Sequence, residues 1–76
     1  MNDNRKKEIN RVIEQLDELR SEIERIAEEE GDDYDNLPEA IQYSERGERM
    51  TEVVRALEDQ AFALEDIINE LTDTKD

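Results

Sequence analysis

Two stretches of the chain place their apolar residues at alternating steps of three and four. The apolar positions of the first stretch are Ile9, Val12, Leu16, Leu19, Ile23 and Ile26. This heptad spacing is typical of an amphipathic helix that packs against another helix. The pattern stops at Glu30, and the Gly31 that follows is a common helix terminator. We therefore predict a helix over residues 4–30, capped by Asp3 or Asn4.

The second stretch repeats the pattern closer to the C-terminus. Its apolar positions are Met50, Val54, Leu57, Ala61, Leu64, Ile68 and Leu71. Ser44 is a good N-cap, and Glu45 and Glu48 favour a helix start directly after it, which predicts a helix over residues 45–72. Gly47 costs this helix about 1 kcal/mol relative to Ala. We therefore expect another segment of backbone to approach Gly47 closely.

Residues 31–44 form a linker that holds the only Pro and both Tyr residues of the chain. Pro38 suits the first turn of a short helix near residues 38–42. Because the linker reverses the chain, the two long helices become antiparallel neighbours. The sequence therefore predicts an all-α protein in which residues 1–76 form a single domain, an antiparallel helical hairpin of coiled-coil type.

Closing the hairpin predicts a register between the two helices. The pairs across it are Ile26–Met50, Ile23–Val54, Leu19–Leu57, Leu16–Ala61, Val12–Leu64 and Ile9–Ile68. The same register brings Arg20 near Glu58, and the bases of the N-terminus near the acids of the C-terminal turns. Those bases are Lys6, Lys7 and Arg11, and those acids are Glu65, Asp66, Glu70 and Asp73.

Additional apolar residues make both stripes wider than two helices need. Ile13 and Ala27 widen the first stripe, and Val53 and Ile67 widen the second. A two-helix contact requires a narrower stripe, and two helices alone bury little apolar surface for a stable domain. We therefore predict that two hairpins dimerise into a four-helix bundle. The alternative is a monomer in which the short linker helix is a third packing element.

The net charge of −14 limits the partners that the chain can bind. Phosphate backbones and anionic membranes would repel it over most of its length. Basic protein surfaces and further copies of the chain remain as partners. No apolar run resembles a signal peptide or a membrane span, so we expect a soluble cytoplasmic protein.

The residues required for most kinds of catalysis are absent from the sequence. The chain has no His and no Cys, which excludes the usual nucleophile–base pairs and the His- or Cys-containing metal sites. Counted as an EF-hand loop from Asp33, the linker places Pro38 where Gly is needed and Ser44 where Glu is needed. No glycine-rich phosphate loop is present. We predict that the chain is not an enzyme and uses no metal and no cofactor.

Acidic residues gather on the outer face of the second helix. Glu52, Asp59, Asp66 and Asp73 share this face, with Glu58 and Glu65 beside them. Neighbouring carboxylates on a helix lie about 5–6 Å apart. Two interpretations are open: a solvated face that keeps the protein soluble, or an imitation of a phosphate backbone that occupies the nucleic-acid site of a basic enzyme.

Three aromatic residues and one leucine are candidates for partner contacts. Phe62 lies roughly 130° from the centre of the apolar stripe and has acidic helical neighbours. It is either a contact to the second hairpin, which we favour, or an anchor for a basic partner. Tyr34, Leu37 and Tyr43 are expected to pack the linker onto the end of the bundle, and contact with another protein is the alternative.

The linker sequence resembles a motif of a known group of proteins. The motif comprises Tyr34-Asp35-Asn36-Leu37-Pro38-Glu39, Ser44-Glu45-Arg46-Gly47-Glu48 and Met50. It is similar to the linker of small acidic helical-hairpin proteins of Gram-positive bacteria, their phages and mobile elements. The group has no assigned activity, so the resemblance implies a setting, the host cytoplasm for a phage protein, and no mechanism.

Together these features predict a function in protein–protein interaction. We expect a non-enzymatic, self-associating acidic helical module. The alternative is a nucleic-acid mimic that inhibits a host defence or repair enzyme. The candidate partner-binding residues are Tyr34, Leu37, Tyr43, Glu58, Asp59, Phe62, Glu65 and Asp66.

Overall fold

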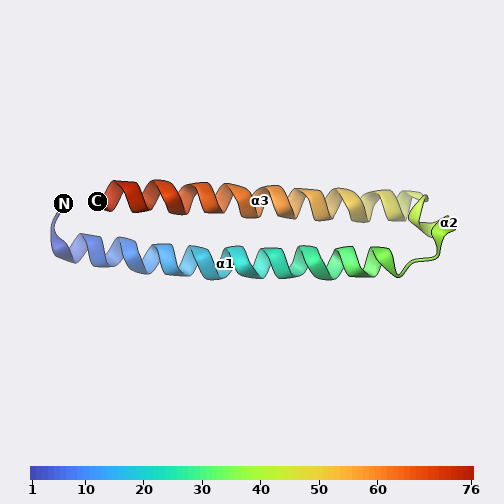
Figure 1. The fold of residues 1–76 in the computed structure, drawn as a ribbon, viewed down its shortest axis with the longest axis horizontal. Helices are drawn as coiled ribbons and strands as arrows, with labels where there is room; N and C mark the ends of the chain where they lie inside the picture. Colours follow the sequence, from blue (N-terminus) through green and yellow to red (C-terminus); the bar gives the residue numbers. More distant parts are fainter.

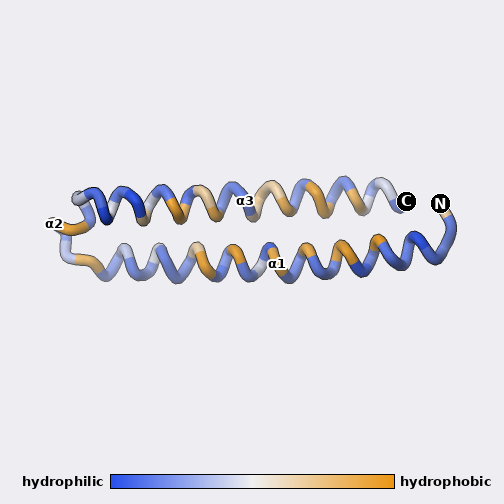
Figure 2. The backbone as a smooth tube through the Cα atoms, turned by 180° about the vertical axis from the view of Figure 1, so that it is seen from behind, coloured by the Kyte–Doolittle hydropathy of each residue, from blue (hydrophilic) through white to orange (hydrophobic).

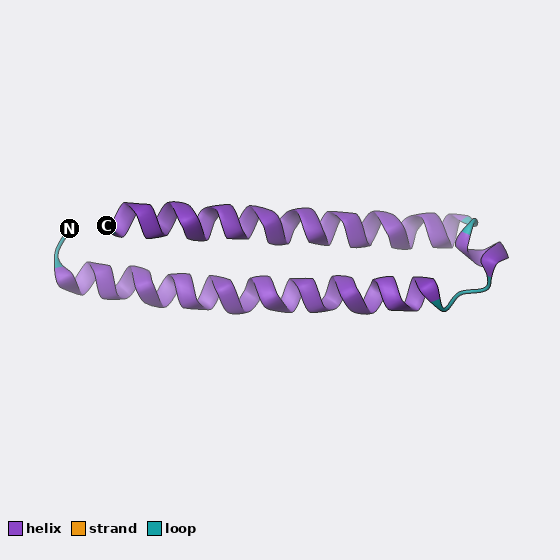
Figure 3. Ribbon diagram, in the orientation of Figure 1, coloured by secondary structure: helices purple, strands orange, loops and turns teal.

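The computed structural model describes residues 1–76 and consists of three helices without any strand, so the all-α prediction is confirmed (Figure 3). Helix α1 spans Asp3–Asp35, α2 spans Glu39–Gln42 and α3 spans Glu45–Lys75. The two long helices lie side by side and run in opposite directions, with both termini at one end and α2 at the other (Figure 1). The molecule measures 59 × 14 × 11 Å, so no residue of either long helix lies far from solvent.

Helix α1 begins and ends at different residues from those predicted. Its N-cap is Asn2, whose side-chain oxygen accepts a hydrogen bond from the Arg5 N–H at 2.8 Å. The predicted caps, Asp3 and Asn4, lie inside the helix. At the other end, α1 continues through Gly31 for one further turn, because Gly31 has no positive φ and therefore does not act as a terminator.

The end of α1 is set by the residues around Pro38. The residue before a proline is sterically disfavoured in the helical conformation, and Leu37 occupies that position. The N–H of Leu37 donates to the Tyr34 carbonyl at 3.0 Å, and the N–H of Asn36 donates to the Asp32 carbonyl at 3.1 Å. These bonds satisfy carbonyl groups of the last turn of α1.

The predicted short helix is present as α2, and a glutamine joins it to α1. Pro38 is the N-cap of α2, with φ −55° and ψ 144°, and therefore lies just before its first turn. The side-chain amide of Gln42 donates to the Tyr34 carbonyl at 3.0 Å. The last turn of α1 is thereby hydrogen-bonded to the last residue of α2.

The close approach expected at Gly47 is observed. Ser44 caps α3 as predicted, and its hydroxyl oxygen accepts a hydrogen bond from the Gly47 N–H at 3.5 Å. A Cβ atom placed on Gly47 would lie 2.7 Å from the Gln42 Cα and closer still to the Gln42 carbonyl. Backbone of α2 therefore occupies the space that any side chain at position 47 would need.

The α1–α3 interface is formed by residues at steps of three and four on both helices. On α1 these residues are Ile9, Ile13, Leu16, Arg20, Ile23, Ala27, Glu30 and Tyr34, and on α3 they are Gly47, Met50, Val54, Leu57, Ala61, Leu64, Ile68 and Leu71. Only Ala27 and Ala61, each 3% exposed, and Gly47 are fully buried. Figure 2 shows the hydrophobic positions as bands that recur along both helices.

The predicted stripe is correct for α3 and wrong for half of α1. Val12, Leu19 and Ile26, expected in the interface, are 41%, 50% and 45% exposed. Ile13, Arg20 and Ala27 occupy the interface in their place, one residue further along the chain. Rotating α1 by one residue moves a whole row of apolar side chains out of the contact.

The predicted register changes together with this rotation. The exposed side chains of Leu19 and Ile26 do not fill the places opposite Leu57 and Met50. α1 ends at Asp35 and α3 begins at Glu45 at the same end of the molecule. The last turn of α1, at Gly31, Tyr34 and Asp35, lies beside Thr51, Val54, Arg55 and Glu58 of α3.

The two glycines provide a matched test of the turn. Replacing Gly47 by Ala forces a methyl group into the Gln42 backbone, and we expect the free energy of unfolding to fall by about 1–3 kcal/mol. Replacing Gly31 by Ala meets no atom within 4 Å, and the gain in helix propensity should raise the free energy of unfolding by about 0.5–1 kcal/mol. Urea unfolding followed by circular dichroism measures both effects. A stabilising Gly47→Ala substitution would contradict the close approach.

Candidate functional site

Helix geometry divides the helix pair into two sides. Gly31 of α1 and Thr51 and Glu58 of α3 each directly follow an interface residue, and all three line the same pocket. Because the helices are antiparallel, residues that follow interface positions share one side of the pair on both helices. Residues that directly precede interface positions therefore share the opposite side.

The side formed by preceding residues is apolar, and we call it the apolar side. Its apolar members are Val12, Leu19 and Ile26 of α1 and Val53, Ala56, Ala63 and Ile67 of α3, and its polar members include Glu8, Gln15, Glu22, Glu29 and Gln60. Of these residues, Val12, Leu19, Ile26 and Ile67 are 41–50% exposed, and only Val53 is half-buried. Large aliphatic side chains thus recur along one side of both helices without a partner within the chain.

The opposite side, which we call the acidic side, carries three of the eight candidate partner-binding residues. Glu58 and Glu65 follow the interface residues Leu57 and Leu64, and Phe62 follows Ala61. The Phe62 ring is 70% exposed. This placement separates Phe62 from the exposed aliphatic residues, although we expected it to join them in a contact between hairpins.

None of the four candidate acids has an ion-pair partner in the chain. Glu58, Asp59, Glu65 and Asp66 are all exposed, and no Lys or Arg nitrogen lies within 4.0 Å of their carboxylate oxygens. The ion pairs that do form lie elsewhere, mainly on α1. The middle of α3 therefore presents negative charge that nothing in the chain neutralises.

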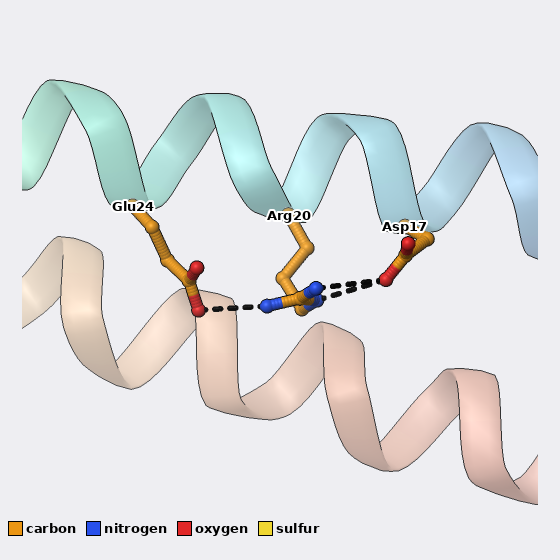
Figure 4. Close-up of polar contacts among 3 residues, drawn as sticks. All are labelled: Asp17, Arg20 and Glu24. Atoms are coloured by element: carbon orange, nitrogen blue, oxygen red, sulfur yellow. Dashed lines mark hydrogen bonds and ion pairs between the residues drawn. The ribbon is translucent and has the colours of Figure 1, made fainter.

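Arg20 is the charged residue at the centre of the α1–α3 interface. Its guanidinium group binds the Asp17 carboxylate at 2.8 Å and the Glu24 carboxylate at 2.8 Å, both on its own helix (Figure 4). The hydrogen bond with Asp17 is the largest of the effects that raise the pKa of Arg20, and the charge of Glu24 adds to it.

The interhelical ion pairs predicted from the sequence are not formed. Arg20 binds Asp17 and Glu24 rather than Glu58, and no ion pair joins α1 to α3. The expected contacts of Lys6, Lys7 and Arg11 with the acids of the last turns are likewise absent. The shifted register accounts for this difference, because the expected pairs were derived from another alignment of the two helices.

A pocket of about 320 Å³ lies on the acidic side near α2. It is lined by Gly31, Tyr34, Asp35, Thr51, Val54, Arg55 and Glu58. The pocket exists because Gly31 has no side chain to fill the space beside α3. The pocket is open to solvent, and two of its seven lining residues, Tyr34 and Val54, are hydrophobic.

The pocket brings two candidate residues together and leaves the others apart. Tyr34 and Glu58, 24 positions apart in the chain, line opposite walls contributed by α1 and α3. Leu37 is half-buried in the turn, as expected for packing there. Tyr43 is 76% exposed, so it does not pack onto the end of the helix pair as predicted. One sequence feature could have indicated the pocket: Gly31 lies inside a helix and directly follows an interface residue.

Neither a cluster of metal-ligating side chains nor a membrane-spanning helix is present in the structure. No group of three or more Asp, Glu, His or Cys side chains is placed to hold a metal ion. None of the helices combines the length and the apolar composition needed to cross a lipid bilayer. Comparison with protein-family models, curated proteins and solved structures gives no significant match.

Neutralising acids on α3 should stabilise the fold. We expect the triple variant Asp59→Asn, Glu65→Gln, Asp66→Asn to gain about 0.2–0.5 kcal/mol in the free energy of unfolding at low ionic strength, because unpaired like charges repel. Glu24→Gln is the matched control, and it should lose about 0.3–0.5 kcal/mol because it removes an ion pair of Arg20. Urea unfolding measures both, and added salt should reduce both differences. A loss of stability in the triple variant would show that these acids do not destabilise the fold by repelling one another.

Proposed function

We propose that this chain is a non-enzymatic protein–protein interaction module, a helical hairpin that dimerises with a second copy through its apolar side. The observation that carries the proposal is the exposure of Val12, Leu19, Ile26 and Ile67, each at least 41%. Contiguous exposed aliphatic surface on a small protein marks an interaction site. A second hairpin that covers this surface would complete a four-helix bundle.

The small amount of surface buried by one chain supports the same proposal. Only Ala27, Ala61 and Gly47 are fully buried, and no large side chain is. A helix pair without a large buried side chain gains little hydrophobic stabilisation. Chains of this size are commonly stabilised by association with another chain. A further copy is a suitable occupant of the apolar side, because it offers the same exposed aliphatic residues.

The acidic side remains free in such a dimer and suits a different partner. Phe62 and the unpaired acids Glu58 and Glu65 then face solvent in both copies. An exposed aromatic ring surrounded by carboxylates fits a basic protein surface, where the ring fills a pocket and the acids steer association. The linker resembles that of acidic proteins of Gram-positive bacteria and their phages, and we propose that the contact occurs in such a setting.

Truncating one side chain on each side tests the dimer. Leu19→Ser should weaken dimerisation about 10- to 100-fold, because each dimer would lose two half-exposed leucines from its interface, at ~1.5–3 kcal/mol for each fully buried side chain. Phe62→Ser should leave dimerisation unchanged. Sedimentation equilibrium measures both constants, and circular dichroism checks that the helices persist. Monomeric wild-type protein, or dissociation by Phe62→Ser alone, would overturn the proposal.

A second candidate function is imitation of nucleic acid, and the unpaired carboxylates of α3 favour it. In this function the protein would occupy the nucleic-acid site of a basic host enzyme. The triple variant Asp59→Asn, Glu65→Gln, Asp66→Asn should then fail to displace labelled duplex DNA from that enzyme, while the wild-type protein displaces it. Leu19→Ser is the control for loss of self-association. Equal displacement by the wild-type protein and the triple variant would remove this candidate.

A further inference from the structure

The apolar side of α3 has a sequence that reads similarly in both directions. Its residues, at steps of three and four, are Val53, Ala56, Gln60, Ala63 and Ile67. A β-branched residue stands at each end, an alanine stands inside each of these, and Gln60 is at the centre. Such a stripe matches itself when a second copy of the same helix is laid against it in the opposite direction.

The charges beyond the ends of this stripe also match in the antiparallel arrangement. Arg49 and Glu70 are the next residues on the same side, one beyond each end. When two copies of α3 are paired about Gln60, Arg49 of one copy faces Glu70 of the other, twice in each dimer. Glu70 has no ion-pair partner within the chain, and Arg49 has only a long contact of 3.6 Å with Glu52.

The apolar side of α1 fits the same two-fold axis. Leu19 stands midway between Val12 and Ile26, with Gln15 and Glu22 between them on the same side. A two-fold axis across the middle of both helices therefore places Leu19 against Leu19 and Val12 against Ile26. Toward the ends, Arg5 and Asp33 of opposite copies face one another, and Glu8 and Glu29 are also brought together.

From this symmetry we infer that two copies dimerise about a two-fold axis through Leu19 and Gln60, with α3 antiparallel to α3 and α1 antiparallel to α1. The inference rests on the proposed function, since it takes association through the apolar side as given. An isologous interface requires a self-complementary surface, and this side supplies one. The other two-fold arrangement places α1 over α3, so that neither the two Gln60 amides nor Arg49 and Glu70 of opposite copies meet.

The Gln60 amide gains a partner in the inferred dimer. On the axis, the two Gln60 side chains of opposite copies meet, and each can donate to the carbonyl oxygen of the other. The alanines on either side of Gln60 allow the two α3 helices to approach closely. A central polar pair of this kind fixes the register of helix pairing at some cost in stability.

Single cysteine substitutions test the arrangement directly, because the chain contains no cysteine. Gln60→Cys should form a disulfide-linked dimer with itself under mild oxidation. The rate should exceed that of Phe62→Cys, on the acidic side, on the order of 100-fold, as expected for millimolar effective concentration within a dimer against micromolar protein. Val53→Cys should cross-link with Ile67→Cys in a mixture and poorly with itself.

Separate outcomes identify which proposal fails. Monomeric wild-type protein in sedimentation equilibrium overturns the self-association itself. A dimer in which Gln60→Cys cross-links with Leu19→Cys, and not with itself, overturns only the inferred arrangement of the helices.

A charge exchange provides a second test that needs no cysteine. Arg49→Glu and Glu70→Arg should each weaken the wild-type dimer, and the protein carrying both substitutions should regain wild-type affinity. If the double substitution only added the two losses, Arg49 and Glu70 would not face each other, and the inferred axis would be wrong.

Discussion

The close contact between the backbones of Gln42 and Gly47 determines how the rest of the molecule is arranged. It holds the start of α3 against the end of α2, and the Gln42 amide joins α2 to the Tyr34 carbonyl at the end of α1. Because α1 ends and α3 begins at this turn, it sets which residues of α1 lie level with which residues of α3. Every surface described above depends on this alignment, since rotating either helix by one residue changes which side chains it exposes.

Much of this fold could be predicted from the sequence, and the exceptions have physical causes. The two helices, the short helix after Pro38, the Ser44 cap and the close approach at Gly47 all follow from local residue chemistry. The interface of α1 does not, because Ile9, Leu16 and Ile23 belong equally to a stripe with Val12 or to one with Ile13. Choosing the first stripe avoids an arginine in the interface, yet Arg20 is accommodated there by its ion pairs with Asp17 and Glu24.

The same ambiguity in the rotation of α1 limits what the sequence predicts about the surfaces. The acids of α3 and Phe62 were identified from spacing alone, and their exposure agrees with that identification. Their separation from the exposed aliphatic residues depends on the true rotation of α1, which spacing leaves ambiguous. The pocket beside Gly31 was missed for a related reason, since a glycine near the end of a charged helix indicates a terminator more readily than a hollow.

Both ends of the chain emerge together, and the turn lies at the far end of a rod 59 Å long. Any segment joined to either terminus is therefore held away from the exposed Tyr43 and from the pocket near the turn. In mechanical terms the helix pair is a stiff spacer as well as a surface. It sets a fixed distance between a segment attached at the termini and a partner that contacts the turn.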